Sequence, residues 1–166
     1  MTKIKMVWAE DQQHAIGKDG KLPWHIPADL KLFREETTDT LMIMGRTTWL
    51  SIGRPLPNRT SLVLTRQLTW HTDFDDVLIA HSVDDVLSFI KNDSRDVSIV
   101  GGASIYRTFM LYATDLIVTR IDAVINGDTF VDDIDLTQFE LISQQPHEKD
   151  DKNEYAFVVE RYQRKN

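Results

Sequence analysis

Short apolar runs alternate with helix-like segments along most of the chain. "IKMVWA" (4–9) is the first run, and most of the others are four to six residues long. Strands that are buried on both faces of a parallel sheet have continuous apolar sequences of this kind. The alternation therefore predicts an α/β fold with a mainly parallel sheet. The strands are expected at 4–9, 40–45, 60–66, 76–80, 115–122, 139–145 and 153–163, with helices at 27–37, 46–52 and 82–92 and a strand leading into a helix at 97–113.

Two details support this prediction. Pro27 suits the first position of a helix, and Ser82 is a good N-cap for the helix that follows it. The last two strands read as a terminal hairpin around the charged loop "PHEKDDKN". Ligands of such folds bind at the carboxyl ends of the strands. The residues to inspect first are therefore those after each run: Gly45-Arg46-Thr47-Thr48, Thr65-Arg66, Gly101-Gly102-Ala103 and Thr119.

Composition narrows the class of protein. A length of 166 residues suits one domain, spanning 1–166. The chain has no cysteine, which excludes disulfides and thiolate metal sites and favours the reducing cytoplasm. The net charge of -7, from 19 basic and 26 acidic residues, argues against sequence-independent binding of nucleic acid. No signal peptide and no apolar segment of about 20 residues is present, so we expect no association with a membrane.

The segment "LPWHIPADLKLF" (22–33) contains one acid among apolar side chains. If Pro27 opens the helix, Asp29 lies in the first turn and shares a face with Phe33. Asp29 could simply complement the helix dipole. Alternatively, it could lie in an apolar pocket and pair with a cationic or amide-like ligand, because a buried carboxylate must be paired or protonated.

The other candidate features are weak when taken one at a time. "MGRTT" and "VGGAS" each place glycine between a buried strand and a helix start, which permits a close approach to phosphate or marks a plain turn. Arg46, Arg59 and Arg66 could bind anionic groups or could be solvated side chains. The histidines at 14, 25, 71, 81 and 147 lack the spacing of metal ligands, so no metal is expected. No G-x-S-x-G motif suggests a serine nucleophile.

Several motifs together are more specific than any general rule. They are "IGKDGKLPWHIPADLKLF", "IMGRTTWLSIGRPLPNR", "LVLTR", "IVGGASIY" and "GDTF", in this order. The chain resembles dihydrofolate reductase of the bacterial chromosomal type over nearly its whole length. The resemblance implies an eight-stranded, mainly parallel sheet with an antiparallel strand at the C-terminal edge and four flanking helices. It also implies reduction of 7,8-dihydrofolate to tetrahydrofolate with NADPH, in a cytoplasmic monomer that antifolate inhibitors would bind.

The resemblance assigns a role to each matched position. Asp29 would bind the N3 and 2-amino group of the pterin, and Arg59 would clamp the glutamate α-carboxylate of the substrate. Leu22 and Trp24 would belong to the catalytic region. The remaining substrate-binding residues would be Val7, Trp8, Ala9, Leu30, Phe33, Ser51, Ile52, Leu56, Val100, Tyr106 and Thr119. The cofactor-binding residues would be Ala9, Ile16, Gly17, Gly45, Arg46, Thr47, Thr48, Leu64, Thr65, Arg66, Val100, Gly101, Gly102, Ala103, Ser104, Ile105 and Tyr106, with a cis peptide between the two glycines.

This sequence departs from some family members at three positions, none of which puts the activity in doubt. Leu22 stands where some carry methionine, Trp8 where others have a small residue, and Ala103 where some have a third glycine. Three other readings remain: a reductase of the same fold acting on a pyrimidine, a non-catalytic pterin- or nucleotide-binding module, and a scaffold protein. The first would lack the Pro-Trp segment and "RPLPNR". Loss of NADPH absorbance with dihydrofolate would discriminate all of them.

The expected mechanism follows from the placement of Asp29. A carboxylate that holds N3 and the 2-amino group is on the wrong edge of the ring to reach N5. We therefore expect Asp29 to bind and polarise the pterin while a water delivers the proton. Burial raises the pKa of Asp29 and the helix start lowers it, and we expect burial to have the larger effect.

Overall fold

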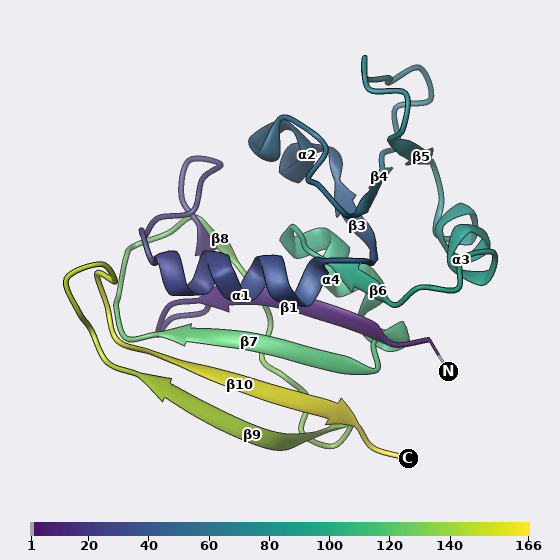
Figure 1. Ribbon diagram of the computed structural model, residues 1–166. Helices are drawn as coiled ribbons and strands as arrows, with labels where there is room; N and C mark the ends of the chain where they lie inside the picture. Colours follow the sequence, from purple (N-terminus) through teal and green to yellow (C-terminus); the bar gives the residue numbers. More distant parts are fainter. Residues whose placement is uncertain (1) are drawn as a thin grey trace.

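The computed structural model describes residues 2–166, and its centre is one eight-stranded sheet (Figure 1). The strands lie in the order β5-β4-β3-β6-β1-β7-β10-β9. Their bounds are β1 Ile4–Glu10, β3 Leu41–Gly45, β4 Thr60–Leu64, β5 Leu78–Ala80, β6 Val97–Ile99, β7 Asp115–Ile121, β9 Phe139–His147 and β10 Phe157–Arg164. The helices are α1 Pro27–Thr37, α2 Arg46–Ile52, α3 Val83–Lys91 and α4 Ala103–Phe109, followed by the 3₁₀ turn η1 Met110–Tyr112.

The strand directions confirm the expected α/β class. Every neighbouring pair from β5 to β7 is parallel, whereas β10 runs antiparallel to both β7 and β9. The antiparallel strand is therefore next to the C-terminal edge, and β9 forms the edge itself. In β3, Leu41, Met42, Ile43 and Met44 are all fully buried, which explains the continuous apolar run in this part of the sequence.

Two helices cover each face of the sheet. Alternate residues of β3 point to opposite sides: Ile43 packs in the same cluster as Val86 of α3 and Phe109 of α4. Met44 packs instead with Trp49 of α2, in a cluster that Phe33 of α1 also contacts. Figure 1 shows α1 lying along β1 and β7 on this same face. The carboxyl ends of the parallel strands lie between the layer of α1 and α2 and the layer of α3 and α4.

The structure differs from the predicted elements at several boundaries. A small second sheet pairs β2 (Ala15–Gly17) with β8 (Thr129–Phe130), and these strands are too short to leave an apolar pattern. Strand β9 continues to His147 through Pro146, which was expected in a loop, and proline is tolerated because β9 is an edge strand. β10 begins at Phe157 rather than at position 153.

Two helix starts behave as expected. Pro27 occupies the first turn of α1, with Asp29 also in that turn. The Ser82 side chain caps α3 by accepting a hydrogen bond from the Asp85 N–H at 3.0 Å. At the start of α1, the N–H of Ala28 donates to Asn153 Oδ1 at 3.0 Å, which ties the helix to the loop of the terminal hairpin.

Asp11, directly after β1, holds the turn that leads to β2. Its Oδ1 accepts hydrogen bonds from the backbone N–H groups of Gln13 and Ala15, both at 2.8 Å. Its Oδ2 accepts from the N–H of Ile125 at 3.0 Å, and the residue is buried. One carboxylate thus satisfies three backbone donors from two distant parts of the chain.

We predict that Asp11→Ala lowers the free energy of unfolding by about 3 kcal/mol, because it leaves these donors unpaired. Asp11→Asn keeps an acceptor for two of the three donors, so its loss should be about half as large. Urea unfolding of the ligand-free proteins measures both values. A loss below about 1 kcal/mol for the alanine variant would show that water replaces the carboxylate at little cost.

Candidate active site

A cavity of about 950 Å³ opens at the carboxyl ends of the parallel strands. Its walls come from strand ends, from α1 and α2, from the start of α4 and from the segment between β1 and α1. The predicted site residues that line it are Val7, Trp8, Ala9, Ile16, Gly17, Leu22, Asp29, Leu30, Phe33, Gly45, Arg46, Thr47, Thr48, Ser51, Ile52, Leu64, Thr65, Arg66, Val100, Gly101, Gly102, Ala103, Ser104, Ile105 and Tyr106.

Asp29 is the only carboxylate among the described residues that line this cavity. It is half-buried, with Leu30 and Phe33 from the same helix on the cavity wall. Burial raises the pKa of the Asp29 carboxyl above its ordinary value of 3.8, while a hydrogen bond with the Thr119 side chain lowers it. Burial has the larger effect on this pKa, as expected.

Four predicted site residues lie outside the cavity lining: Trp24, Leu56, Arg59 and Thr119. Thr119 is buried behind the wall, where its side chain meets Asp29. Trp24 is also buried, and its indole Nε1 has no hydrogen-bond partner among the described residues. Leu56 is partly buried and packs against the cluster under α2.

Arg59 is held at a fixed place by two hydrogen bonds. Its Nε donates to the carbonyl of Pro57 at 2.9 Å, and one terminal nitrogen donates to Thr37 Oγ1 at 3.0 Å. Burial lowers the pKa of Arg59, and so does the positive charge of Arg34. No carboxylate in the described chain forms an ion pair with Arg59 within 4.0 Å. A guanidinium placed in this way suits an anionic ligand.

The two strand-end glycines come together in the middle of the site. The peptide between Gly101 and Gly102 is cis, as the resemblance implied. The N–H of Gly45 donates to the carbonyl of Gly101 at 2.9 Å, so the ends of β3 and β6 are joined. A Cβ at Gly101 would lie 3.2 Å from the Tyr106 hydroxyl, on a backbone with a φ of +118°. That hydroxyl donates to the carbonyl of Val7 at 2.8 Å.

Basic and hydroxyl side chains gather at the far end of the cavity. Arg46 begins α2, and Thr65 and Arg66 follow β4. Thr65 is buried and its carbonyl lies 2.9 Å from His81 Nδ1, whereas Arg66 is exposed. Arg46 donates to Gln67 Oε1 at 3.4 Å. This end of the cavity is therefore electropositive although the chain as a whole is acidic.

Comparison with known proteins gives a consistent result. Residues 3–164 match the family model of dihydrofolate reductase. The chain belongs to the dihydrofolate reductase family. A dihydrofolate reductase from Bacillus subtilis is 37% identical over 163 residues, which are 98% of this chain and 95% of the relative. One from Enterococcus faecium is 35% identical over 159 residues, or 95% of each chain.

Solved structures of the family share the fold. Dihydrofolate reductase from Enterococcus faecalis, solved in complex with NADP(H) and RAB-propyl, is 38% identical in sequence. It superimposes with a TM-score of 0.89 and covers 99% of this chain and 97% of its own. Between residues 2 and 166, no helix is both long and apolar enough to cross a membrane.

Some residues that line this cavity were not predicted from the sequence: Gly20, Lys21, His81, Ser82, Val83, Thr108 and Thr129. A signal existed for His81 and Ser82, because they follow β5 at the same edge of the sheet as the other strand ends. Thr129 belongs to the short strand β8, which has no apolar pattern to mark it.

The raised pKa of Asp29 predicts how stability depends on pH. The folded state keeps the proton of Asp29 at pH values where the unfolded chain has released it, so this group destabilises the fold as the pH rises through its folded pKa. Asp29→Asn removes this penalty. We expect the ligand-free variant to be about 1 kcal/mol more stable than the original chain at neutral pH. The difference should disappear as the pH falls toward 3.8.

Urea unfolding over a series of pH values tests this. Asp151→Asn, in an exposed loop, is the control for the same chemical change and should show no such trend. A stability difference that is equal at all pH values would contradict the assignment of the buried charge to Asp29.

Proposed function

We infer that this chain is an NADPH-dependent dihydrofolate reductase, which reduces 7,8-dihydrofolate to 5,6,7,8-tetrahydrofolate for one-carbon metabolism and nucleotide synthesis. The observation that carries this inference is the lone carboxylate, Asp29, in an otherwise apolar part of the cavity of a chain that belongs to this family. When bound, NADPH supplies the hydride from nicotinamide C4 to pterin C6. The other steps depend on how the chain holds the ring.

We propose that Asp29 binds the N3 and 2-amino group of the pterin. The ring presents two donors at this edge, and a carboxylate can accept both. Thr119, behind the wall, orients the carboxylate, and the backbone carbonyls of Val7 and Val100 face the amino group. Because N5 lies on the opposite edge of the ring, Asp29 polarises the pterin while a water molecule brings the proton.

The segment between β1 and α1 closes this part of the site. Leu22 is 55% exposed at the mouth of the cavity, so it can cover a bound ring and exclude bulk water. Trp24, in the same segment, is buried, and no described protein group accepts a hydrogen bond from its indole N–H. We therefore assign both residues to the catalytic region.

The substrate tail fits the other wall. Leu30, Phe33, Ser51 and Ile52 line a passage toward the surface, and Leu56 packs beneath it. Arg59 has no acidic partner among the described residues, and we propose that it clamps the α-carboxylate of the glutamate tail. Antifolates that carry pterin-like donors should bind to the same residues.

For the cofactor, the available groups fit a dinucleotide phosphate. Thr65, Arg66 and Arg46 provide a hydroxyl and two guanidiniums for the 2'-phosphate. Gly101 and Gly102 keep the backbone free of side chains beside the pyrophosphate and the nicotinamide. We propose that the cofactor also contacts Ala9, Ile16, Gly17, Gly45, Thr47, Thr48, Leu64, Val100, Ala103, Ser104, Ile105 and Tyr106.

We further propose that residues 1–166 fold as one domain and that the enzyme is a cytoplasmic monomer, binding neither nucleic acid nor a membrane. The continuous sheet, which joins segments from both ends of the chain, supports the single domain. Light scattering after gel filtration measures the mass against 19.2 kDa for one chain. A single calorimetric transition would support one cooperative unit.

The decisive experiment measures loss of NADPH absorbance with dihydrofolate for the original chain and for Asp29→Asn. The amide places a donor where the ring also donates, and breaking a buried charged contact costs on the order of 3–5 kcal/mol. Turnover at neutral pH should fall by roughly two to four decades. Asp151→Asn should leave it unchanged. Turnover of Asp29→Asn within a few-fold of the original chain would refute the role of Asp29.

A second prediction concerns the choice of cofactor. Each charge-assisted hydrogen bond contributes roughly 1.5–3 kcal/mol. Because Arg66 is exposed, we expect its bond to the phosphate to contribute an energy at the lower end of this range. We expect kcat/KM to favour NADPH over NADH by about two decades, with the preference falling as salt is added. Arg46→Ala/Arg66→Ala should lose most of this preference, whereas Arg107→Ala, exposed on α4, should retain it. If the double variant kept the full preference, these arginines would be ordinary solvated side chains.

A further inference from the structure

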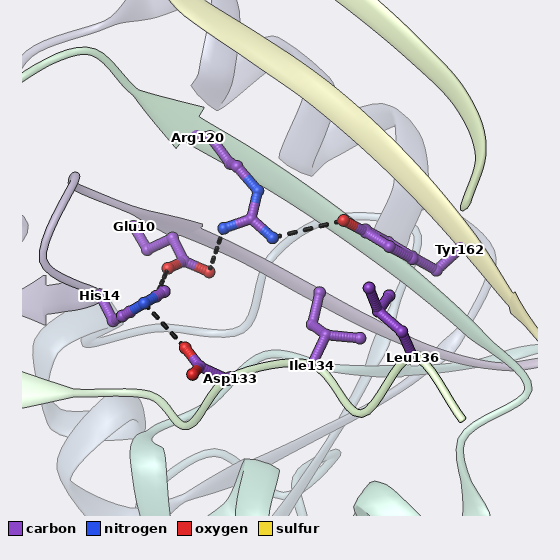
Figure 2. Close-up of a pocket in the computed structure, with 7 residues that line it drawn as sticks. All are labelled: Glu10, His14, Arg120, Asp133, Ile134, Leu136 and Tyr162. Carbon is purple, nitrogen blue, oxygen red and sulfur yellow. Dashed lines mark hydrogen bonds and ion pairs between the residues drawn. The ribbon is translucent and has the colours of Figure 1, made fainter. Parts of the chain in front are cut away.

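A second, smaller cavity of about 290 Å³ lies behind the active site, and charged side chains surround it (Figure 2). Glu10 ends β1, His14 lies in the turn before β2, and Arg120 belongs to β7. Asp133, after β8, and Tyr162, on β10, complete the polar wall. Nothing in the proposed reaction uses these residues.

Glu10 is the centre of this cluster. It is only 1% exposed, and its carboxylate contacts the side chains of Trp8, His14 and Arg120. Figure 2 shows His14 and Arg120 approaching its carboxylate from two sides. Arg120, the residue paired with Glu10 across β1 and β7, lies 3.5 Å from Oε1, and His14 Nδ1 bonds to Oε2. His14 Nε2 in turn lies 2.8 Å from Asp133.

One hydrogen bond links Glu10 to Trp8, a residue that lines the large cavity. The indole Nε1 of Trp8 donates to Glu10 Oε1 at 3.0 Å, and this contact is buried. Trp8 and Glu10 are two residues apart on β1, so both side chains lie on the same face of the strand. Trp8 lines the large cavity and packs on Tyr106 with ring centroids 5.4 Å apart.

We propose that Glu10 is a positioning residue for dihydrofolate binding: it holds the Trp8 indole against the Tyr106 ring, whose hydroxyl donates to the Val7 carbonyl that we place beside the pterin amino group. Arg120 and His14 fix Glu10, so these contacts are anchored to β7 and to the turn that leads to Ile16 and Gly17. An indole can swing about two side-chain torsions, and its bond to a carboxylate that is itself immobilised selects one orientation. This inference rests on the proposed function.

The cluster contains its own control. Glu160 on β10 bonds to Arg120, to the Tyr162 hydroxyl and to Gln144, but not to Trp8. Glu160→Gln therefore makes the same chemical change in the same network and leaves the Trp8 bond in place. An effect that passes through Trp8 should appear in Glu10→Gln and be absent from Glu160→Gln.

The first measurement is the indole N–H resonance of Trp8 in the NMR spectrum of the ligand-free protein. The chain has four tryptophans, and Trp8→Phe identifies the resonance by its loss. In Glu10→Gln it should move upfield, because a bond to a charged acceptor becomes a bond to a neutral one. In Glu160→Gln it should stay in place. If Glu10→Gln fails to fold, Glu10→Asp gives the same test. Aspartate keeps the negative charge beside Arg120 and His14, but its side chain is one methylene shorter, so its carboxylate lies farther from the Trp8 indole and the resonance should again move.

The second measurement is steady-state kinetics. Glu10→Gln should raise KM for dihydrofolate roughly three- to tenfold, with KM for NADPH changed less than about twofold. Glu160→Gln should change neither constant. In the double variant Trp8→Phe/Glu10→Gln, KM for dihydrofolate should match that of Trp8→Phe alone, because the second change acts only through the indole.

Two results would overturn this role of Glu10: a Trp8 resonance that stays in place in both Glu10 variants, or an equal rise in KM in Glu160→Gln. Absence of turnover in the original chain would instead overturn the proposed function. The indole resonance would still report whether Glu10 holds Trp8, so the two failures are distinguishable.

Discussion

Burial of parallel strands on both faces is the constraint from which the site arises. Because the strands of β5 to β7 run in one direction, their carboxyl ends meet at one edge, and residues far apart in sequence become neighbours there. Gly45 and Gly101 meet in this way through a backbone hydrogen bond. The packed layers above and below hold this edge of the sheet in place.

The carboxylate that we propose as the pterin ligand is placed at a cost to the fold. Asp29 stands in a helix whose other cavity-facing side chains, Leu30 and Phe33, are apolar. Burial raises the pKa of Asp29, and the hydrogen bond with Thr119 offsets only part of this desolvation. The same isolation makes the group selective, because a ligand without matching donors would leave the carboxylate unpaired. Stability and recognition thus oppose each other at one residue.

The sequence predicts the elements that have a clear hydrophobic pattern and the candidate sites that carry a sequence motif. It selects Asp29, Arg59 and the Gly101–Gly102 pair as candidates, and it places most strands within a few residues. It could not find β2 and β8, which are three and two residues long. The cluster around Glu10 was also out of reach, since Glu10 and Arg120 become partners only through the register of β1 and β7.

Pro146 in β9 has a consequence for the behaviour of the enzyme at high concentration. An edge strand offers a row of free backbone groups on which another polypeptide could add as a further strand. Proline has no N–H to donate, and its ring obstructs an approaching backbone. Together with the exposed Glu140 near the start of the strand, Pro146 makes β9 a poor template for self-association. The edge strand β9 therefore also helps to protect the folded chain from aggregation.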